Sequence, residues 1–210
     1  VSVFAYAADN RLLAMGGAGG ALGGEAELLF VNPSALGGLL RGEFQAGHAS
    51  LYGLGFNEEY AVLAWPDYRW GVLGIGLRQL GVGGIEERDE RNLLLGDDLA
   101  SVDQQLTLAY GRPFGHAWRF GAGLNLRRQE LAGYSDGALG LDLGLQLLPG
   151  RLLGRETGFL RGLRAGLGLR NVIRPSINLD QESVEDPPSL RLALAHSIPL
   201  GGFDLNTACD

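Results

Sequence analysis

The sequence predicts an all-β protein, a transmembrane antiparallel β-barrel, from three observations. Apolar and polar residues alternate with a period of two from about residue 43 onward, as they do along strands whose successive side chains point to opposite faces. The chain contains 35 glycines, many of them inside the alternating segments. It has no continuous run of about 18 apolar residues, which a transmembrane helix needs, whereas a barrel strand needs only about 9–11 alternating residues.

Five segments show the alternation most clearly, and in each a leucine-rich face opposes a face of Gly, Arg and amide groups. They are 71–79, 118–129, 139–147, 164–170 and 190–195. The polar face of a soluble sandwich usually carries Thr, Ser, Lys and Glu. Here that face is half glycine, which weakens a strand unless another backbone approaches closely. Because a leucine face suits lipid, we favour a membrane barrel; the alternative is a soluble β-sheet interaction protein.

The predicted strands are joined by short connections on one side, at 66–69, 112–117 and 201–202, and by long ones on the other, at 81–98 and 175–188. This is the layout of outer-membrane barrels, which the link 149–162 does not fit. Six aromatic residues flank two short turns, and we interpret them as an interfacial girdle, with core aromatics that cap turns as the alternative. They are Trp65, Tyr68, Trp70, Tyr110, Phe114 and Trp118.

Charge is sorted along the chain, whose formal net charge is −7. Segment 81–98 holds six acidic residues against two arginines, and segment 175–188 holds four acidic residues and no base, so each has a net charge of −4. We interpret this acid as solvated charge; the alternative is divalent cations that bridge it to lipopolysaccharide phosphates. The acidic balance argues against nucleic acid as a partner.

The sequence offers no catalytic or metal site. All 17 basic residues are Arg, and the single Cys209 and three scattered His residues do not have metal-ligand spacing. The glycine pairs between Gly16 and Gly24 lack the strand context and the Lys of a phosphate loop, and no nucleophile elbow is present. We therefore expect no enzyme activity and no cofactor.

Residues 1–42 lack the period of two and form a unit separate from the strands at 43–210. Ala5-Tyr6-Ala7 has the form of a signal-peptidase site, so we read the start as a signal-peptide remnant. Segment 25–30 suits one or two helical turns, and Asn32 with Pro33 suits the start of another short helix. The rest is glycine-rich, and we expect it to pack as a compact, irregular segment against the strands.

The phrases RLLAMGGA at 11–18 and FVNPSAL at 30–36 resemble the PorV/PorQ-type family of outer-membrane proteins, within the FadL-like transporter superfamily. Glycine-rich phrases at 81–86, 140–144 and 167–172 add weaker support. The family more often has Ala where this chain has Ser34. The resemblance implies a fourteen-stranded barrel with an N-terminal hatch in its lumen. We count eight strands and a ninth that starts at Phe203, so 43–210 is expected to be an incomplete barrel in a chain truncated at both ends.

From this resemblance we expect a protein of the bacterial outer membrane that passively transports hydrophobic or amphipathic small molecules. Gly16, Gly17, Asn32 and Pro33 would belong to the hatch. Eight polar residues would face the lumen, either to attract an anionic head group or to fill it with Arg–Asp networks. They are Arg78, Arg119, Asn125, Arg127, Asp142, Arg164, Arg170 and Arg191. The alternative function is a PorV-like component of type IX secretion that binds translocon or cargo proteins. The expected partners are outer-membrane lipids and lipopolysaccharide, with a small-molecule ligand or secretion-system proteins.

Overall fold

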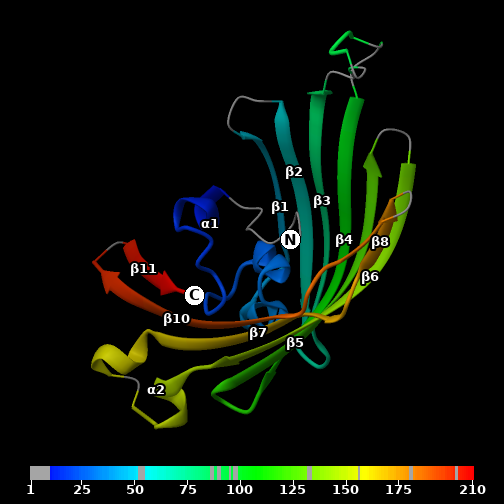
Figure 1. The fold of residues 1–210 in the computed structure, drawn as a ribbon. Coiled ribbons are helices and arrows are strands. Elements are labelled where there is room, and N and C mark those ends of the chain that lie inside the picture. The colour runs from blue at the N-terminus through cyan, green and yellow to red at the C-terminus, as the bar shows by residue number, and fades with distance from the viewer. Residues whose placement is uncertain are drawn as a thin grey trace.

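The computed structural model describes residues 10–210 apart from 52–54, 86–87, 89–90, 95, 97–98, 132–133, 156, 180–181 and 202. The predicted signal-peptide remnant therefore lies outside the described residues. One antiparallel sheet of nine strands dominates the chain (Figure 1). Its strands, in spatial order, are β1 (Glu43–Leu51), β2 (Phe56–Asp67), β3 (Gly71–Ile85), β4 (Leu99–Phe114), β5 (Trp118–Leu131), β6 (Tyr134–Leu147), β7 (Leu163–Ile173), β10 (Ser189–Leu200) and β11 (Phe203–Cys209).

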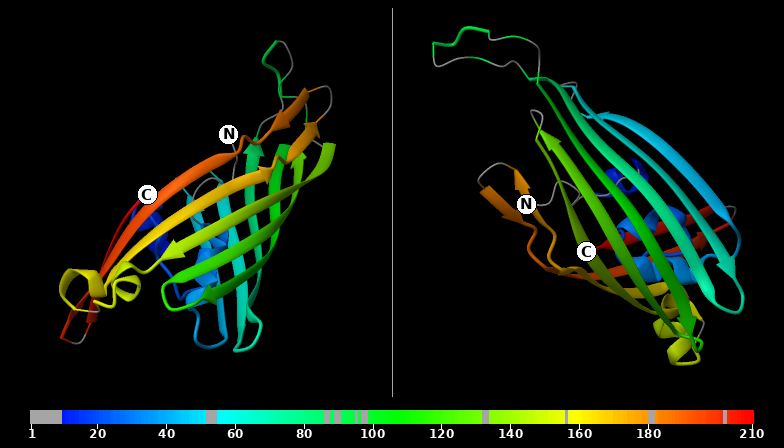
Figure 2. Two further views of the ribbon diagram at one scale, coloured as in Figure 1. Left: turned by 90° about the horizontal axis from the view of Figure 1, so that it is seen from below. Right: turned by 90° about the vertical axis from the view of Figure 1, so that its right-hand side faces the viewer.

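The predicted all-β, antiparallel architecture is confirmed, because every neighbouring pair in this sheet is antiparallel. The sheet is strongly curved, and the N-terminal residues lie on its concave side (Figures 1 and 2). Within the described parts of the chain, β1 and β11 are the two edges of the sheet. Closure into a barrel is thus not a feature of the structure. None of the described helices is long and apolar enough to cross a membrane.

The two faces of the sheet differ in the way that the alternation predicts. We call the face that residues 10–42 cover the inner face, and the opposite one the outer face. On β3, Gly74 and Gly76 face Leu29 and Phe30 of the N-terminal segment. Leu73 and Ile75, which alternate with these glycines along the strand, are 67% and 42% exposed. Leucine therefore lies on the outer face and glycine on the inner face.

The connections divide between two ends of the sheet. The turn end carries 68–70, 115–117, 148–162 and 201–202, and the loop end carries 52–55, 86–98, 132–133 and 174–188. The expected contrast in length holds only in part, because β5 and β6 are joined at the loop end by 132–133 alone. At the turn end, α2 (Pro149–Leu152) and the 3-10 helix η3 (Gly158–Arg161) occupy the link that did not fit the prediction.

The connection predicted as a long loop at 175–188 contains a hairpin. Its strands, β8 (Ser176–Leu179) and β9 (Glu182–Glu185), form a separate two-stranded sheet. The pairing of β6 with β7 shifts register between Leu141 and Leu143, and Asn171 opposite this shift has a φ of 53°. The bulge at Asn171 redirects the end of β7 toward β6 and the hairpin.

The N-terminal segment, residues 10–42, contains α1 (Asn10–Ala14) and two 3-10 helices, η1 (Ala26–Phe30) and η2 (Pro33–Gly38). Two apolar clusters join it to the inner face. In one cluster, side chains of η1 and η2 contact β2, β3 and β4: Leu29, Phe30, Leu36, Val62, Ala64, Val72 and Ala109. In the other, side chains of α1, η1, η2 and the residues between these helices contact β10: Leu12, Leu22, Leu28, Val31, Ala35, Ala193 and Ala195. The sheet residues are small, so the segment lies close to the sheet.

Candidate functional site

The inner face holds a seat of glycines for the N-terminal segment. Gly111, Gly121, Gly144 and Gly168 lie directly opposite one another across β4, β5, β6 and β7. A Cβ at Gly121 would overlap the backbone of Pro33 and Ser34, and a Cβ at Gly144 would overlap Oδ1 of Asn32. A neighbouring glycine, Gly166, is blocked in the same way by the carbonyl of Gly20. Close backbone approach therefore explains the glycines at 121 and 166.

Asn32 organises the segment above this seat. Its Oδ1 accepts from the backbone N of Ser34 at 3.2 Å, as the N-cap of η2, and from Oγ of Ser34 at 2.7 Å. Its Nδ2 donates to the carbonyl of Gly20 at 2.6 Å. The predicted cap at Asn32, with Pro33 as the first helical residue, is confirmed. One buried amide thus links two stretches of the N-terminal segment.

Carboxylates and amides of the sheet hold both sides of the segment. At one sheet edge the side chain of Asp210 accepts from the backbone N atoms of Gly19 and Gly20 at 3.1 Å. At the other edge Glu43 of β1 accepts from the backbone N of Ala26 at 3.1 Å. Between them Gln146 of β6 donates to the carbonyl of Leu22. The segment is therefore fastened to β1, β6 and the end of β11.

Gly16 and Gly17, the other two residues predicted for the hatch, lie away from the glycine seat. Both have positive φ, 70° and 82°, and no atom lies within 4 Å of a Cβ built on either. They form the turn that ends α1, where the N of Gly17 donates to the carbonyl of Leu12 at 2.7 Å. Their role is to reverse the chain, since L-residues rarely adopt this backbone region.

Toward the loop end, the inner face carries buried charge. Nε of Arg78 on β3 donates to Oε1 of Glu58 on β2 at 2.6 Å, and both side chains are only 1% exposed. Next to β3, a chain of hydrogen bonds crosses three strands. Gln105 donates to Thr107 at 2.9 Å, Thr107 donates to Asn125 at 2.7 Å, and Asn125 donates to Asp142 at 2.8 Å.

Asp142 connects this chain to the bulge in β7. Its Oδ1 accepts from the backbone N of Asn171 at 2.8 Å, and its Oδ2 lies 3.9 Å from Nε of Arg170. Arg127 donates to Oδ1 of Asn171 at 3.3 Å and pairs with Asp186. The polar network therefore ties β4, β5, β6 and β7 to the chain that follows the β8–β9 hairpin.

Of the remaining predicted arginines, Arg119 and Arg164 lie toward the turn end of the inner face, whereas Arg191 lies near the start of β10, opposite Gly168. Arg119 approaches Oε1 of Gln146 at 3.5 Å, and Arg191 approaches Asp210 at 3.5 Å. Arg164 lines a cavity of about 690 Å³ that also borders Glu25 of the N-terminal segment, Ser197 and Asn206. All eight residues predicted to face a lumen thus lie on the inner face.

Several partners in this network were missed from the sequence. Glu58, Gln105, Thr107, Gln146 and Asn171 are buried. The reading of segment 175–188 as solvated charge is wrong for Asp186, whose side chain is 14% exposed and paired with Arg127. The acidic residues of the other segment lie outside the described residues, as does Asp180: Glu86, Glu87, Asp89, Glu90, Asp97 and Asp98.

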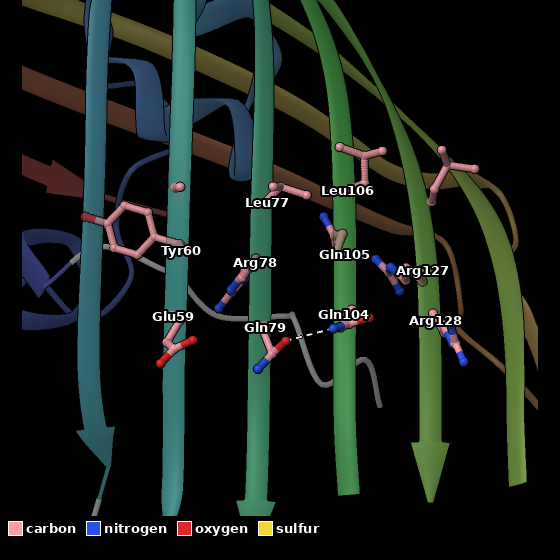
Figure 3. Close-up of a pocket in the computed structure, with 12 residues that line it drawn as sticks. Glu59, Tyr60, Leu77, Arg78, Gln79, Gln104, Gln105, Leu106, Arg127 and Arg128 are labelled. Atoms are coloured by element: carbon pink, nitrogen blue, oxygen red, sulfur yellow. Dashed lines mark hydrogen bonds between the residues drawn. The ribbon is translucent and has the colours of Figure 1, made fainter.

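The outer face is banded in rows of paired residues (Figure 3). Glu59, Gln79, Gln104 and Arg128 are opposite one another on β2 to β5, and Gln104 donates to Gln79 at 2.7 Å. The next row toward the turn end is Ala61, Leu77, Leu106 and Leu126, with a groove of about 540 Å³ along the boundary. A polar row at the loop end therefore borders an apolar belt.

The apolar belt ends in aromatic residues at the turn end. Trp65, Tyr68, Trp70 and Phe114 are each at least 68% exposed, so the alternative reading as core aromatics is wrong for these four. The hydroxyl of Tyr110 donates to the carbonyl of Trp70. Exposed aromatic side chains beside an apolar belt are the arrangement of an interfacial girdle.

No family model matches this sequence, and no match was found among curated proteins or solved structures. Among the described residues, no group of three or more His, Cys, Asp or Glu side chains is arranged to hold a metal ion. The functional argument therefore rests on the two faces of the sheet and on the seated N-terminal segment.

Proposed function

We propose that this chain supplies wall strands and a hatch to a transmembrane β-barrel of a bacterial outer membrane, and that hydrophobic or amphipathic small molecules pass through it. The observation that carries the proposal is the inverted polarity of the sheet. Large apolar side chains stay exposed on the outer face from β2 to β10, while paired charges such as Glu58 and Arg78 are buried inside. A soluble protein exposes charge and buries leucine, whereas a membrane barrel does the reverse.

The N-terminal segment suits the role of a hatch because it lies on the concave side of the sheet (Figure 1), where polar contacts join it to the wall beside the two apolar clusters. Hydrogen bonds from Asp210, Glu43 and Gln146 fasten it, and such bonds exchange with water at a small net cost of about 0.5–1.5 kcal/mol each. The cavity of about 690 Å³ beside Arg164 opens between the segment and the wall. A molecule that passes the hatch would reach the turn end through this space.

The test is uptake by vesicles that contain the refolded chain. The probe is 8-anilinonaphthalene-1-sulfonate, an amphipathic anion that bare bilayers admit slowly, with albumin trapped inside as the fluorescent reporter. Asn32→Ala removes the amide that joins η2 to Gly20. We expect it to accelerate uptake roughly tenfold, since losing the bonds of a buried polar group costs about 1–3 kcal/mol.

Asn57→Ala is the matched control, because this amide is exposed on β2 and donates only a 3.4 Å bond to Gly55. It should leave the uptake rate unchanged. Transport would be contradicted if vesicles with the native chain and vesicles with the Asn32 variant both took up the probe no faster than empty vesicles. If the chain does not float together with the vesicles in a flotation assay, the membrane location itself would be contradicted.

A further inference from the structure

We propose that the turn end carries a basic rim that binds the phosphates of anionic phospholipids in the leaflet it faces. The rim consists of six exposed arginines: Arg41, Arg69, Arg112, Arg151, Arg155 and Arg161. This inference rests on the proposed membrane location and goes beyond it, because it assigns a lipid class and a surface that the transport proposal does not need.

The rim is distinguished by the sign of its charge. In the sequence, the strand ends and links of the same end carry four acidic residues beside these six arginines, Glu43, Asp67, Glu156 and Asp204, which leaves a net charge of +2. The two long segments of the loop end have a net charge of −4 each. A chain that is acidic overall thus has a net positive charge at the turn end and a net negative charge in the two long segments of the loop end. Such a field attracts a negative surface within about one Debye length.

The link between β6 and β7 places apolar side chains beside these arginines. Leu152, Leu153 and Phe159 are 52%, 61% and 67% exposed. Phe159 stacks on His196 of β10 with ring centroids 4.4 Å apart, and its carbonyl lies 2.7 Å from Nε2 of that histidine. These contacts hold η3 against β10. The exposed aromatic residues of the turn end therefore extend from the β2–β3 turn to β10 on the other side of the sheet.

Exposed Leu and Phe next to Arg form the pattern of a segment that lies in a membrane interface. The planar guanidinium donates in a fork that matches two phosphate oxygens. The rim directly borders the apolar belt. A bilayer whose acyl chains cover the belt therefore places its phosphates at the level of the rim. At the β2–β3 turn, Oδ1 of Asp67 accepts from the backbone N atoms of Arg69 and Trp70 at 2.8 and 2.9 Å, and its negative charge is already counted in the net charge of +2.

The experiment measures partition of the refolded chain into two kinds of vesicle, by tryptophan emission and flotation. One is phosphatidylcholine alone, and the other contains about one third phosphatidylglycerol. The test variant is Arg155→Gln/Arg161→Gln. We expect it to lose about 25-fold in partition into the anionic vesicles, roughly fivefold for each arginine, and to be unchanged in phosphatidylcholine.

Arg128→Gln/Arg174→Gln is the matched control, because it removes the same charge from exposed positions at the loop end. It should change partition by less than about twofold. Equal losses in both variants would overturn the rim, since net charge alone would then explain the binding. Insertion that does not depend on phosphatidylglycerol would overturn the rim and leave the membrane location intact, whereas no insertion in either vesicle would overturn both.

Discussion

Asn32 and Gly144 meet where the N-terminal segment crosses β6, and the amide of Asn32 occupies the space that a Cβ on Gly144 would fill. We predict that Gly144→Ala displaces the segment and lowers the free energy of unfolding by about 1–3 kcal/mol, the usual cost of overpacking. Denaturant unfolding measures the loss, and protease cleavage near Asn32 reports the displacement.

Gly168→Ala is the control for this prediction, since Gly168 lies directly opposite Gly144 in the same row. A Cβ there meets only the Cβ of Arg191, at 3.9 Å. Replacing glycine within a strand then stabilises by roughly 0.5–1 kcal/mol. If both alanines had the same effect, the row would not be a seat for the N-terminal segment.

The ion pair of Glu58 and Arg78 gives a second prediction. Glu58→Ala leaves a buried guanidinium without its carboxylate, so we expect a loss of about 3–5 kcal/mol in stability. Replacing both residues, as Glu58→Leu/Arg78→Met, removes both charges and should cost much less. Arg128→Gln breaks the exposed pair with Glu130 and should change stability by less than about 1 kcal/mol. A double variant as unstable as the single one would contradict this account.

The third prediction concerns Asp142, which links the β7 bulge to the wall. Asp142→Ala removes the acceptor for the backbone N of Asn171 and the carboxylate near Arg170. Hydrogen exchange of amides in 171–188 should accelerate by roughly ten- to a hundredfold, since breaking such bonds costs about 1.5–3 kcal/mol. Gln104→Ala is the control and should leave these amides unchanged, because it removes only an exposed bond to Gln79 on the outer face.

The alternation of residues was enough to predict the two faces of the strands. Leu73 and Ile75 against Gly74 and Gly76 could be assigned because period two leaves no other arrangement for an extended chain. The sequence did not reveal why glycine recurs, because the contact of Gly121 with Pro33 joins residues 88 positions apart. That contact depends on how the sheet curves around the segment.

Other parts of the site could not be predicted because the sequence does not show which residues of the strand face inward. In Asn57-Glu58-Glu59-Tyr60 each face of the strand receives one glutamate, and only the pairing with Arg78 identifies Glu58 as the buried one. The bulge at Asn171 breaks the period of two after Arg170, and the side-chain amide of Asn171 donates to the carbonyl of Pro187 at 3.4 Å, which lies beyond a hairpin whose strands have four residues each. Long-range pairing decided both positions.

The last prediction separates a membrane wall from a soluble sheet. Ile75 lies in the middle of the apolar belt and is 42% exposed, so in water Ile75→Arg should change stability by less than about 0.5 kcal/mol, like other surface substitutions. In a bilayer the same change puts a guanidinium near the midplane, at a cost of about 2–4 kcal/mol. We expect the larger loss when unfolding is measured from vesicles.

Gln79→Arg is the matched control, because Gln79 lies four residues along the same strand and the same face, in the polar row at the loop end. Near the interface the cost of arginine falls to about 0–1 kcal/mol. A gradient from Gln79 to Ile75 is therefore expected only if lipid covers the outer face. Equal, small effects at both positions would favour the soluble interaction protein, since water screens a surface charge equally at both positions.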